Sequence, residues 1–316
     1  MATFLVTGGA GFIGSNLCHA LVARGDTVRA LDDLSTGRRE NLVGLVPSRF
    51  TLFEGSITDA NVVAEAMRGV DYVLHEAALP SVPRSVEDPI GSDLVNVHGT
   101  VTLLKAAVTA KVKRVVFAAS SSAYGEKAPG DAKIETMASD PLSPYAAQKL
   151  ACEHYLKVFH VCYGLPTVAL RYFNVFGPRQ DPKSQYAAVV PNFVTAALKG
   201  RPATIYGDGG QTRDFCFIDN VVEANLLACT ADGVSGEVFN IACGEATSLL
   251  DVVEAVAQAT GTRIAPIHEP ARTGDIRHSL ANIDKAKTLL GYTGGVKFKE
   301  GIARTIAWYR QAGDAK

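Results

Sequence analysis

Tyr145 and Lys149, a tyrosine and a lysine four residues apart, have the residue types and spacing for acid–base chemistry. They follow Ser143-Pro144, a pair that favours a helix start because the hydroxyl caps free amides and the proline ring pre-sets the first turn. Both side chains then lie on one face of the helix. A neighbouring ammonium and the positive helix end lower the pKa of a phenol from about 10. We therefore expect Tyr145 to act as a base near neutral pH.

The Tyr-Lys spacing also arises by chance on amphipathic helices, so the surrounding motifs decide its meaning. The serine run Ser120-Ser121-Ser122 closes a predicted strand upstream of the pair. Such hydroxyls can take part in proton transfer. They can also satisfy their own backbone at a strand end, and this alternative stays open for Ser122.

The composition is that of a globular enzyme. The chain has 316 residues, 47% hydrophobic and 20% charged, with a formal net charge of -1. No long basic run suggests nucleic acid, and no apolar stretch reaches the ~20 residues of a membrane span. The first residues lack the basic region of a signal peptide. Six scattered cysteines show no zinc spacing. We expect a reduced cytoplasmic enzyme without a metal and without nucleic-acid or membrane partners.

The first half of the chain alternates short β-branched runs with helical patterns. Strands are predicted at 4–7, 27–31, 50–53, 70–74, 114–118 and 167–172, and helices at 13–23, 61–68, 93–110 and 145–163. This alternation predicts an α/β fold with a doubly wound parallel sheet of the Rossmann type. Residues 1–175 are predicted to form that domain. Residues 176–316 are predicted to form a smaller, mainly helical substrate domain, with segments returning to the first sheet.

A glycine-rich loop directly follows the first predicted strand and opens the first helix. Gly8, Gly11 and Gly14 let the backbone turn tightly, approach a pyrophosphate and aim helix amides at its charge. Asp32 ends the second strand, where a carboxylate accepts both hydroxyls of an adenosine ribose and repels a 2'-phosphate. NAD is therefore favoured over NADP, although Arg38 and Arg39 follow closely. The alternative is an aspartate that closes a turn with Asp33 and Ser35.

Taken together, the motifs resemble those of the extended short-chain dehydrogenase/reductase family, and within it the UDP-hexose 4-epimerases. The resemblance runs from Thr3 to about Tyr309. It rests on the glycine loop, on Asp32, and on the motifs at 75–78, 96–100, 120–125, 145–149, 171–177, 212–214 and 272–275. It implies a catalytic set of Ser120, Tyr145 and Lys149, with the tyrosine as base and the lysine on the nicotinamide ribose.

The resemblance also implies a set of NAD contacts. They are Gly8, Gly11, Phe12, Ile13, Gly14, Asp32, Asp33, Ser35, Gly37, Ser56, Ile57, Ala77, Ala78, Asn96, Tyr145, Lys149 and Tyr172. Ala77 and Ala78 would let the nucleotide approach the sheet edge, and Asn96 would orient backbone near the site. Ser56 departs from the pattern, because many relatives have aspartate there to contact adenine.

For a UDP-sugar the resemblance implies a tightly held diphosphate and a loosely held sugar. The implied contacts are Ser81, Val82, Ser120, Ser121, Ser122, Asn174, Ala188, Val189, Ile205, Tyr206, Arg213, Arg272, Asp275 and Ser279. Arg213 and Arg272 would grip the diphosphate, because guanidinium groups bind phosphate oxygens in a bidentate fashion. Asn174 would assist them, Asp275 would hold the uridine ribose, and residues 188, 189, 205 and 206 would border the uracil. Each arginine alone also fits a surface salt bridge.

Ser279 aligns with a position where a tyrosine limits room for a 2-N-acetyl group in these epimerases. A serine leaves space, so UDP-N-acetylglucosamine and its epimer are expected substrates, alongside UDP-glucose. Ser81 and Val82 also resemble the branch that accepts N-acetylated sugars.

Three other functions compete with this one. A UDP-glucuronate 4-epimerase tends to have threonine where this chain has Asn174. A 4,6-dehydratase needs an acid and a base at the positions of Ser121 and Ser122. A non-catalytic NAD-binding protein can lose the tyrosine or the lysine, both of which are present here. A homodimer is expected, through helices near 94–107 and 150–163, where Leu150, Tyr155, Val158, Phe159 and Cys162 are apolar.

Overall fold

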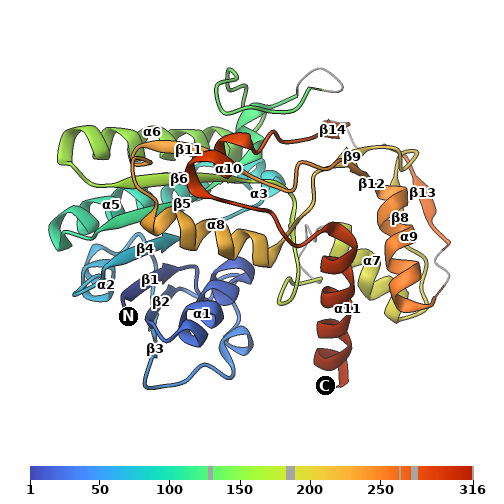
Figure 1. Cartoon of the computed structure of the whole chain (residues 1–316), viewed down its shortest axis with the longest axis horizontal. Helices are drawn as coiled ribbons and strands as arrows, with labels where there is room; N and C mark the ends of the chain where they lie inside the picture. Colours follow the sequence, from blue (N-terminus) through green and yellow to red (C-terminus); the bar gives the residue numbers. More distant parts are fainter. Residues whose placement is uncertain (127–130, 183–188, 263–264, 272–276, 315–316) are drawn as a thin grey trace.

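A parallel seven-stranded sheet forms the centre of the computed structural model, which describes residues 1–126, 131–182, 189–262, 265–271 and 277–314. The strand order is β11-β6-β5-β4-β1-β2-β3 (Figure 1). The strands are β1 (Thr3–Thr7), β2 (Thr27–Asp32), β3 (Phe50–Glu54), β4 (Tyr72–His75), β5 (Arg114–Ser120), β6 (Thr167–Tyr172) and β11 (Glu237–Ile241). The doubly wound architecture is confirmed. Its order reverses between β1 and β4, where a crevice opens at the carboxyl ends of the strands.

Helices cover both faces of this sheet, as a parallel sheet requires. On one face lie α2 (Ala60–Ala66), α5 (Gly99–Ala110) and α6 (Pro144–Tyr163), and on the other lie α1 (Phe12–Arg24) and α8 (Ile218–Thr230) (Figure 1). One buried cluster, with Leu103, Cys152 and Leu156, fills the first face. A larger cluster, with Leu17 and Val221, fills the second face and continues into the rest of the chain.

The helix predicted at 93–110 is interrupted. The structure has α4 (Pro89–Asp93), a π-helical turn η2 (Leu94–His98) and then α5. Gly99 is the first residue of α5. A Cβ added there would lie 2.7 Å from the Ile57 side chain, so this end of α5 closely approaches the loop between β3 and α2. A further helix, α3 (Val82–Glu87), was not predicted, although Ser81 caps it and Pro83 lies in its first turn.

A second lobe lies beside the sheet and contains α7 (Val189–Leu198), α9 (Leu249–Thr260) and α11 (Phe298–Asp314) (Figure 1). Two small sheets accompany these helices. They are formed by β8 (Thr204–Tyr206) with β13 (Ile267–Glu269), and by β12 (Thr247–Ser248), β9 (Thr212–Arg213) and β14 (His278–Ser279).

The later part of the chain also returns to the first sheet. The strand β11 pairs in parallel with β6, and α8 packs on β5 and β6. The short strands β7 (Val175–Phe176) and β10 (Cys216–Phe217) pair beyond the sheet edge, and α10 (Asp284–Leu290) contacts β11. Two 3-10 turns, η1 (Arg39–Leu42) and η3 (Ser121–Tyr124), complete the described elements. Within the described ranges, no helix is both long and apolar enough to cross a bilayer.

Candidate functional site

A cavity of about 550 Å³ opens at the carboxyl edge of the sheet, around the reversal between β1 and β4. The predicted cofactor residues that line it are Gly8, Gly11, Phe12, Ile13, Gly14, Asp32, Asp33, Ser35, Ile57, Ala77, Ala78, Tyr145, Lys149 and Tyr172. They come from β2, β6, α1 and α6 and from the loops that follow β1, β2, β3 and β4. The fold therefore brings together residues spread over more than half of the chain.

The glycine loop has the geometry of a pyrophosphate cradle. Gly8 has φ +65°, a conformation that favours glycine, and a Cβ on it would lie 2.8 Å from the Ala77 nitrogen. A Cβ on Gly14 would lie 2.1 Å from the Gly8 carbonyl oxygen. Within the described part of the chain, no side chain caps α1, so its first-turn amides face the cavity without a protein acceptor. These open amides fit a phosphate group.

Asp32 lies at the end of β2 and is buried. Its carboxylate accepts hydrogen bonds from the Ala10 nitrogen at 2.9 Å and the Leu34 nitrogen at 2.8 Å. Burial raises the pKa of Asp32, while these amides lower it. The turn foreseen as the alternative is present as well, because Asp32 accepts from the Leu34 amide and Asp33 accepts from the Ser35 amide and hydroxyl. Asp32 itself remains aimed into the cavity.

Arg38 and Arg39, the two arginines that favoured NADP as an alternative cofactor, are both paired with carboxylates. Arg38 forms an ion pair with Asp181, and Arg39 forms one with Glu54. A cavity that holds Asp32 beside already neutralised guanidinium groups disfavours a 2'-phosphate. The geometry therefore fits NAD better than NADP.

The predicted catalytic pair, Tyr145 and Lys149, also lines the cavity. Ser143 caps α6 by accepting a hydrogen bond from the Ala146 nitrogen at 3.2 Å, which places Tyr145 in the first turn. The Lys149 ammonium is buried and donates to the Ala118 carbonyl at 2.7 Å. Ser120 hydrogen-bonds the Tyr145 phenol. The three residues thus meet at the edge formed by β5 and α6.

The prediction that the pKa of the Tyr145 phenol is lowered is wrong for the protein without bound cofactor. Burial raises the pKa of Tyr145 to about 12, and the hydrogen bond from Ser120 offsets only part of this. Burial also lowers the pKa of Lys149. The ammonium and the helix end favour the phenolate, but the loss of water around the phenol disfavours the charged form and outweighs them.

The serine run forms the start of η3. The Ser120 hydroxyl accepts hydrogen bonds from the Ser122 nitrogen at 3.2 Å and from the Ser122 hydroxyl at 2.8 Å. The Ser120 hydroxyl therefore satisfies backbone at this strand end, and the Ser122 hydroxyl donates to that of Ser120. Ser121 is half-buried on the same turn.

Three predicted cofactor residues do not line the cavity. The Gly37 position packs on the Asp32 carboxylate, so it shapes the ribose end. The Ser56 hydroxyl pairs with the Thr58 hydroxyl at 2.9 Å, which turns it away from a ligand. Asn96 is buried, accepts from the Leu79 nitrogen at 2.8 Å and donates to Gln148 at 2.9 Å. It orients the backbone near the site, as expected, rather than facing the cavity.

Two predicted substrate residues are neighbours in the second lobe. Arg213 on β9 is the register partner of Ser279 on β14. Arg213 donates to the Thr212 carbonyl at 2.9 Å. The Lys133 ammonium lies 3.4 Å from the buried Ser279 hydroxyl. The sequence predicted that the small Ser279 side chain leaves space around it, but the structure places a lysine beside it.

The remaining substrate predictions fall at several places. Asn174, with φ +31°, lines the cavity and donates to the Asp214 carbonyl at 3.3 Å. Ile205 is fully buried in the core, so its side chain is not free to border a uracil, whereas Tyr206 and Val189 are half-buried. Ser81 caps α3, and Val82 is exposed. Ala188, Arg272 and Asp275 lie outside the described residues.

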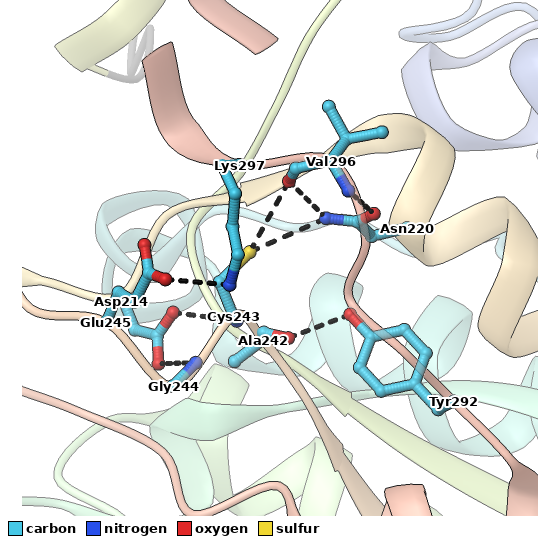
Figure 2. A network of polar contacts seen from close by, with 9 residues as sticks. All are labelled: Asp214, Asn220, Ala242, Cys243, Gly244, Glu245, Tyr292, Val296 and Lys297. Carbon is cyan, nitrogen blue, oxygen red and sulfur yellow. Dashed lines mark hydrogen bonds and ion pairs between the residues drawn. The ribbon is translucent and has the colours of Figure 1, made fainter. Parts of the chain in front are cut away.

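Asp214 fastens the segment that carries Arg213. Its buried carboxylate accepts hydrogen bonds from the Cys243 nitrogen at 2.9 Å and the Gly244 nitrogen at 3.0 Å (Figure 2). It also accepts from the Ala281 nitrogen at 3.2 Å, just beyond β14. Burial raises the pKa of Asp214 to about 6, and these amides lower it. One side chain thus joins the ends of β11 and β14 to β9.

Replacing Asp214 with alanine is expected to lower the free energy of unfolding by at least about 3 kcal/mol, because several buried amides lose their acceptor. Urea unfolding followed by circular dichroism measures this. The matched control is Asp208→Ala, which removes an exposed aspartate paired with Arg277 and should leave the midpoint unchanged. An Asp214→Ala protein as stable as the parent would contradict the proposed fastening.

Sequence reasoning missed several residues that line the cavity or contact a predicted substrate residue, among them Glu76, Arg179 and Lys133. Glu76 and Arg179 line the cavity, and Arg179 donates to the Asn16 side chain at 2.8 Å. A charged residue directly after an apolar strand was the available signal for Glu76. Lys133 had no local signal, because only the pairing of its segment with Ala281 brings it to Ser279.

Comparison with known proteins agrees with this geometry. A model of the NAD dependent epimerase/dehydratase family matches residues 4–242. The chain is 42% identical over 308 residues to a UDP-glucose 4-epimerase of Mycolicibacterium smegmatis, covering 97% of this chain and 98% of that protein. The chain belongs to the NAD dependent epimerase/dehydratase family. The resemblance stated from the sequence is confirmed.

Solved structures of other members share the whole fold of this epimerase/dehydratase. The UDP-glucose 4-epimerase of Thermus thermophilus in complex with NAD is 41% identical, with a TM-score of 0.89, covering 98% of this chain and 99% of that one. The UDP-N-acetylglucosamine 4-epimerase of Methanobrevibacter ruminantium, in complex with UDP-N-acetylmuramic acid, is 39% identical, with a TM-score of 0.91 and the same coverage. The cofactor of this protein is NAD, as predicted.

Proposed function

We propose that this protein is an NAD-dependent 4-epimerase of UDP-sugars. The observation that carries the proposal is that Tyr145 and Lys149 line one end of the NAD cavity and that the Ser120 hydroxyl hydrogen-bonds the Tyr145 phenol. A hydroxyl and a phenol in contact, with an ammonium one turn further along the same helix, suit the removal and return of a proton at a sugar hydroxyl. The names of the relatives point to the same class of substrate.

In this mechanism Tyr145 takes the proton of the sugar 4-hydroxyl, and Ser120 holds the phenol in place. When bound, NAD supplies the hydride acceptor at carbon 4 and a positive charge that favours the phenolate. Lys149, fixed on the Ala118 carbonyl, adds its own charge at this end of the cavity. After the keto sugar rotates, Tyr145 returns the proton to its 4-oxygen, and carbon 4 would receive hydride from the reduced cofactor on its opposite face.

Turning of the keto sugar requires that the diphosphate be held while the sugar is free. Arg213 on β9 and Asn174 at the cavity supply polar groups for such an anchor. The Asp214 carboxylate binds the backbone next to Arg213 to the segments that follow β11 and β14. The anchor is thus built on rigid structure, as a positioning device requires. We propose that Arg272 completes the diphosphate anchor and that Asp275 holds the uridine ribose.

For the sugar itself we propose UDP-N-acetylglucosamine and UDP-N-acetylgalactosamine, together with UDP-glucose and UDP-galactose. Ser279 is the register partner of Arg213, so the proposed gate lies beside the proposed anchor. A serine is far smaller than a tyrosine. The residue can therefore admit a 2-N-acetyl group where a tyrosine would exclude it.

Replacing Ser279 with tyrosine is expected to lower kcat/KM for N-acetylated substrates by about tenfold to a hundredfold relative to UDP-glucose, because the larger ring removes the space for the acetyl group. Parallel assays with both substrates measure the ratio. Ser279→Ala is the matched control and should leave the ratio unchanged. Equal losses on both substrates would contradict the gate.

One observation favours a second candidate, a UDP-glucuronate 4-epimerase. The Lys133 ammonium is buried near Ser279, 3.4 Å from both the Ser279 hydroxyl and the Gly125 carbonyl. A cation at the sugar end would suit a carboxylate at carbon 6. Under this alternative, Lys133→Met would abolish turnover of UDP-glucuronate while sparing neutral sugars.

The experiment that tests the proposed function is incubation of the purified protein separately with UDP-N-acetylglucosamine, UDP-glucose and UDP-glucuronate, followed by separation of the epimers. We expect interconversion of the first two. Turnover of UDP-glucuronate alone would select the second candidate. Tight NAD retention without turnover of any UDP-sugar would reject both.

We also propose a cytoplasmic homodimer. The helix α6 exposes Tyr155, Val158 and Val161 on its outer side, while Phe159 is buried within its own chain. Exposed apolar residues repeated along one helix suit packing against a second copy. Sedimentation of the wild-type protein and of a Val158→Glu variant measures the assembly. A wild-type monomer would contradict it.

A further inference from the structure

Glu76 is a buried carboxyl group at the cofactor cavity for which the proposed mechanism has no use. It directly follows β4 and lines the cavity. One carboxylate oxygen, Oε1, accepts a hydrogen bond from the Tyr172 hydroxyl at 2.9 Å. The other, Oε2, is buried and finds no hydrogen-bond partner among the described residues. A buried acceptor without a partner is costly, which points to a ligand that compensates it.

The position of Glu76 is fixed by a chain of contacts. Tyr172 on β6 holds Glu76 Oε1, and Asn225 on α8 donates to the Tyr172 hydroxyl at 2.8 Å. The Glu76 nitrogen also donates to the Thr7 carbonyl at 3.2 Å. Three elements of the sheet and one helix thus hold this carboxylate in place, so its charge has a defined location beside the cofactor.

That location is the redox end of the cavity. The titratable and charged groups that face Glu76 are Tyr172 from β6, and Lys149 and Tyr145 from α6. The charge of Glu76 raises the pKa of both Tyr145 and Lys149, so it lies within electrostatic range of the catalytic pair. Asp32, at the predicted adenosine end, lies on β2 and is not among the charged groups that act on Glu76.

We propose that Glu76 tunes the cofactor: its carboxylate stabilises the oxidised, positively charged form of bound NAD relative to the reduced, neutral form. Opposite charges attract strongly in a site shielded from water, whereas a neutral ring gains little. The carboxylate itself gains and loses nothing in hydride transfer. It shifts the equilibrium so that hydride returns to the keto sugar and the enzyme rests in its oxidised form.

The tuning depends on the charge state of Glu76. Burial raises the pKa of Glu76 to about 7, while Tyr172 and Lys149 lower it. Below this pH the carboxyl group is neutral in the free chain, and the preference for oxidised NAD fades. By linkage, oxidised NAD in turn lowers the pKa of Glu76, since each charge stabilises the other.

The test is calorimetric titration of the cofactor-free chain with oxidised and with reduced NAD, which requires no sugar and so is independent of the proposed substrate. At about pH 8 we expect Glu76→Gln to weaken oxidised NAD about tenfold and reduced NAD less than about twofold. Glu76→Asp, which keeps the charge, should retain most of the preference. At about pH 5.5 the wild type and Glu76→Gln should behave alike.

Glu65→Gln is the matched control, because it removes one exposed carboxylate on α2, outside the cavity lining, and changes the net charge equally. It should leave both affinities unchanged. Equal weakening of both cofactor forms by Glu76→Gln would assign Glu76 a packing role and overturn the inference. Unchanged affinities for both forms, or a loss of preference in Glu65→Gln, would also overturn it.

Discussion

Replacing Tyr145 with phenylalanine is expected to lower kcat about a thousandfold while NAD stays bound. The substitution removes only the hydroxyl that exchanges the proton with the sugar. The ring remains in the first turn of α6, where the Ser143 cap holds the backbone. Epimerisation assays measure the rate, and calorimetry measures the affinity for NAD.

The matched control is Tyr163→Phe, which removes an exposed hydroxyl at the far end of the same helix. Its activity should equal that of the parent. A Tyr145→Phe protein with parental rates would reject Tyr145 as the base. Loss of NAD together with activity would show that the phenol holds the cofactor instead.

Replacing Gly14 with alanine is expected to weaken NAD binding about a hundredfold or more. The new Cβ would lie 2.1 Å from the Gly8 carbonyl oxygen and 2.9 Å from the Gly9 Cα. Both neighbours are backbone atoms, so the loop must move. The first-turn amides of α1 then no longer point toward the pyrophosphate position. Titration with NAD measures the affinity.

Gly295→Ala is the matched control for this substitution, because its nearest neighbour is the Thr293 hydroxyl at 3.2 Å, a side-chain atom that can rotate. It should leave the affinity for NAD unchanged. Parental NAD affinity in Gly14→Ala would show that the close approach of strand, loop and helix is not needed for the cofactor.

The local patterns of the sequence predicted six of the seven strands of the first sheet, all but β11, and most residues at the NAD end of the cavity. The glycine loop and Asp32 are placed by neighbours within one βαβ unit, so spacing alone located them. The cap of α6 at Ser143 likewise follows from adjacent residues. The small sheets of the second lobe were not predicted, since strands such as Thr212–Arg213 are too short to show a period of two.

The errors arose where tertiary packing decides the outcome. The pKa of Tyr145 depends on burial, which no spacing reveals, and burial raises it. Ile205 is buried because the second lobe packs around β8. Ser279 borders Lys133, which is distant in sequence. The unpartnered oxygen of Glu76 likewise becomes visible only once every neighbour is in place.

The most direct test of the central claim is the fate of deuterium placed at carbon 4 of UDP-N-acetylglucosamine. If Tyr145 takes the hydroxyl proton while hydride passes to NAD and back, the galacto epimer must retain the deuterium at carbon 4. We predict an equilibrium mixture of both epimers with the label retained in each. Loss of the label to solvent, or no epimer at all, would contradict the account.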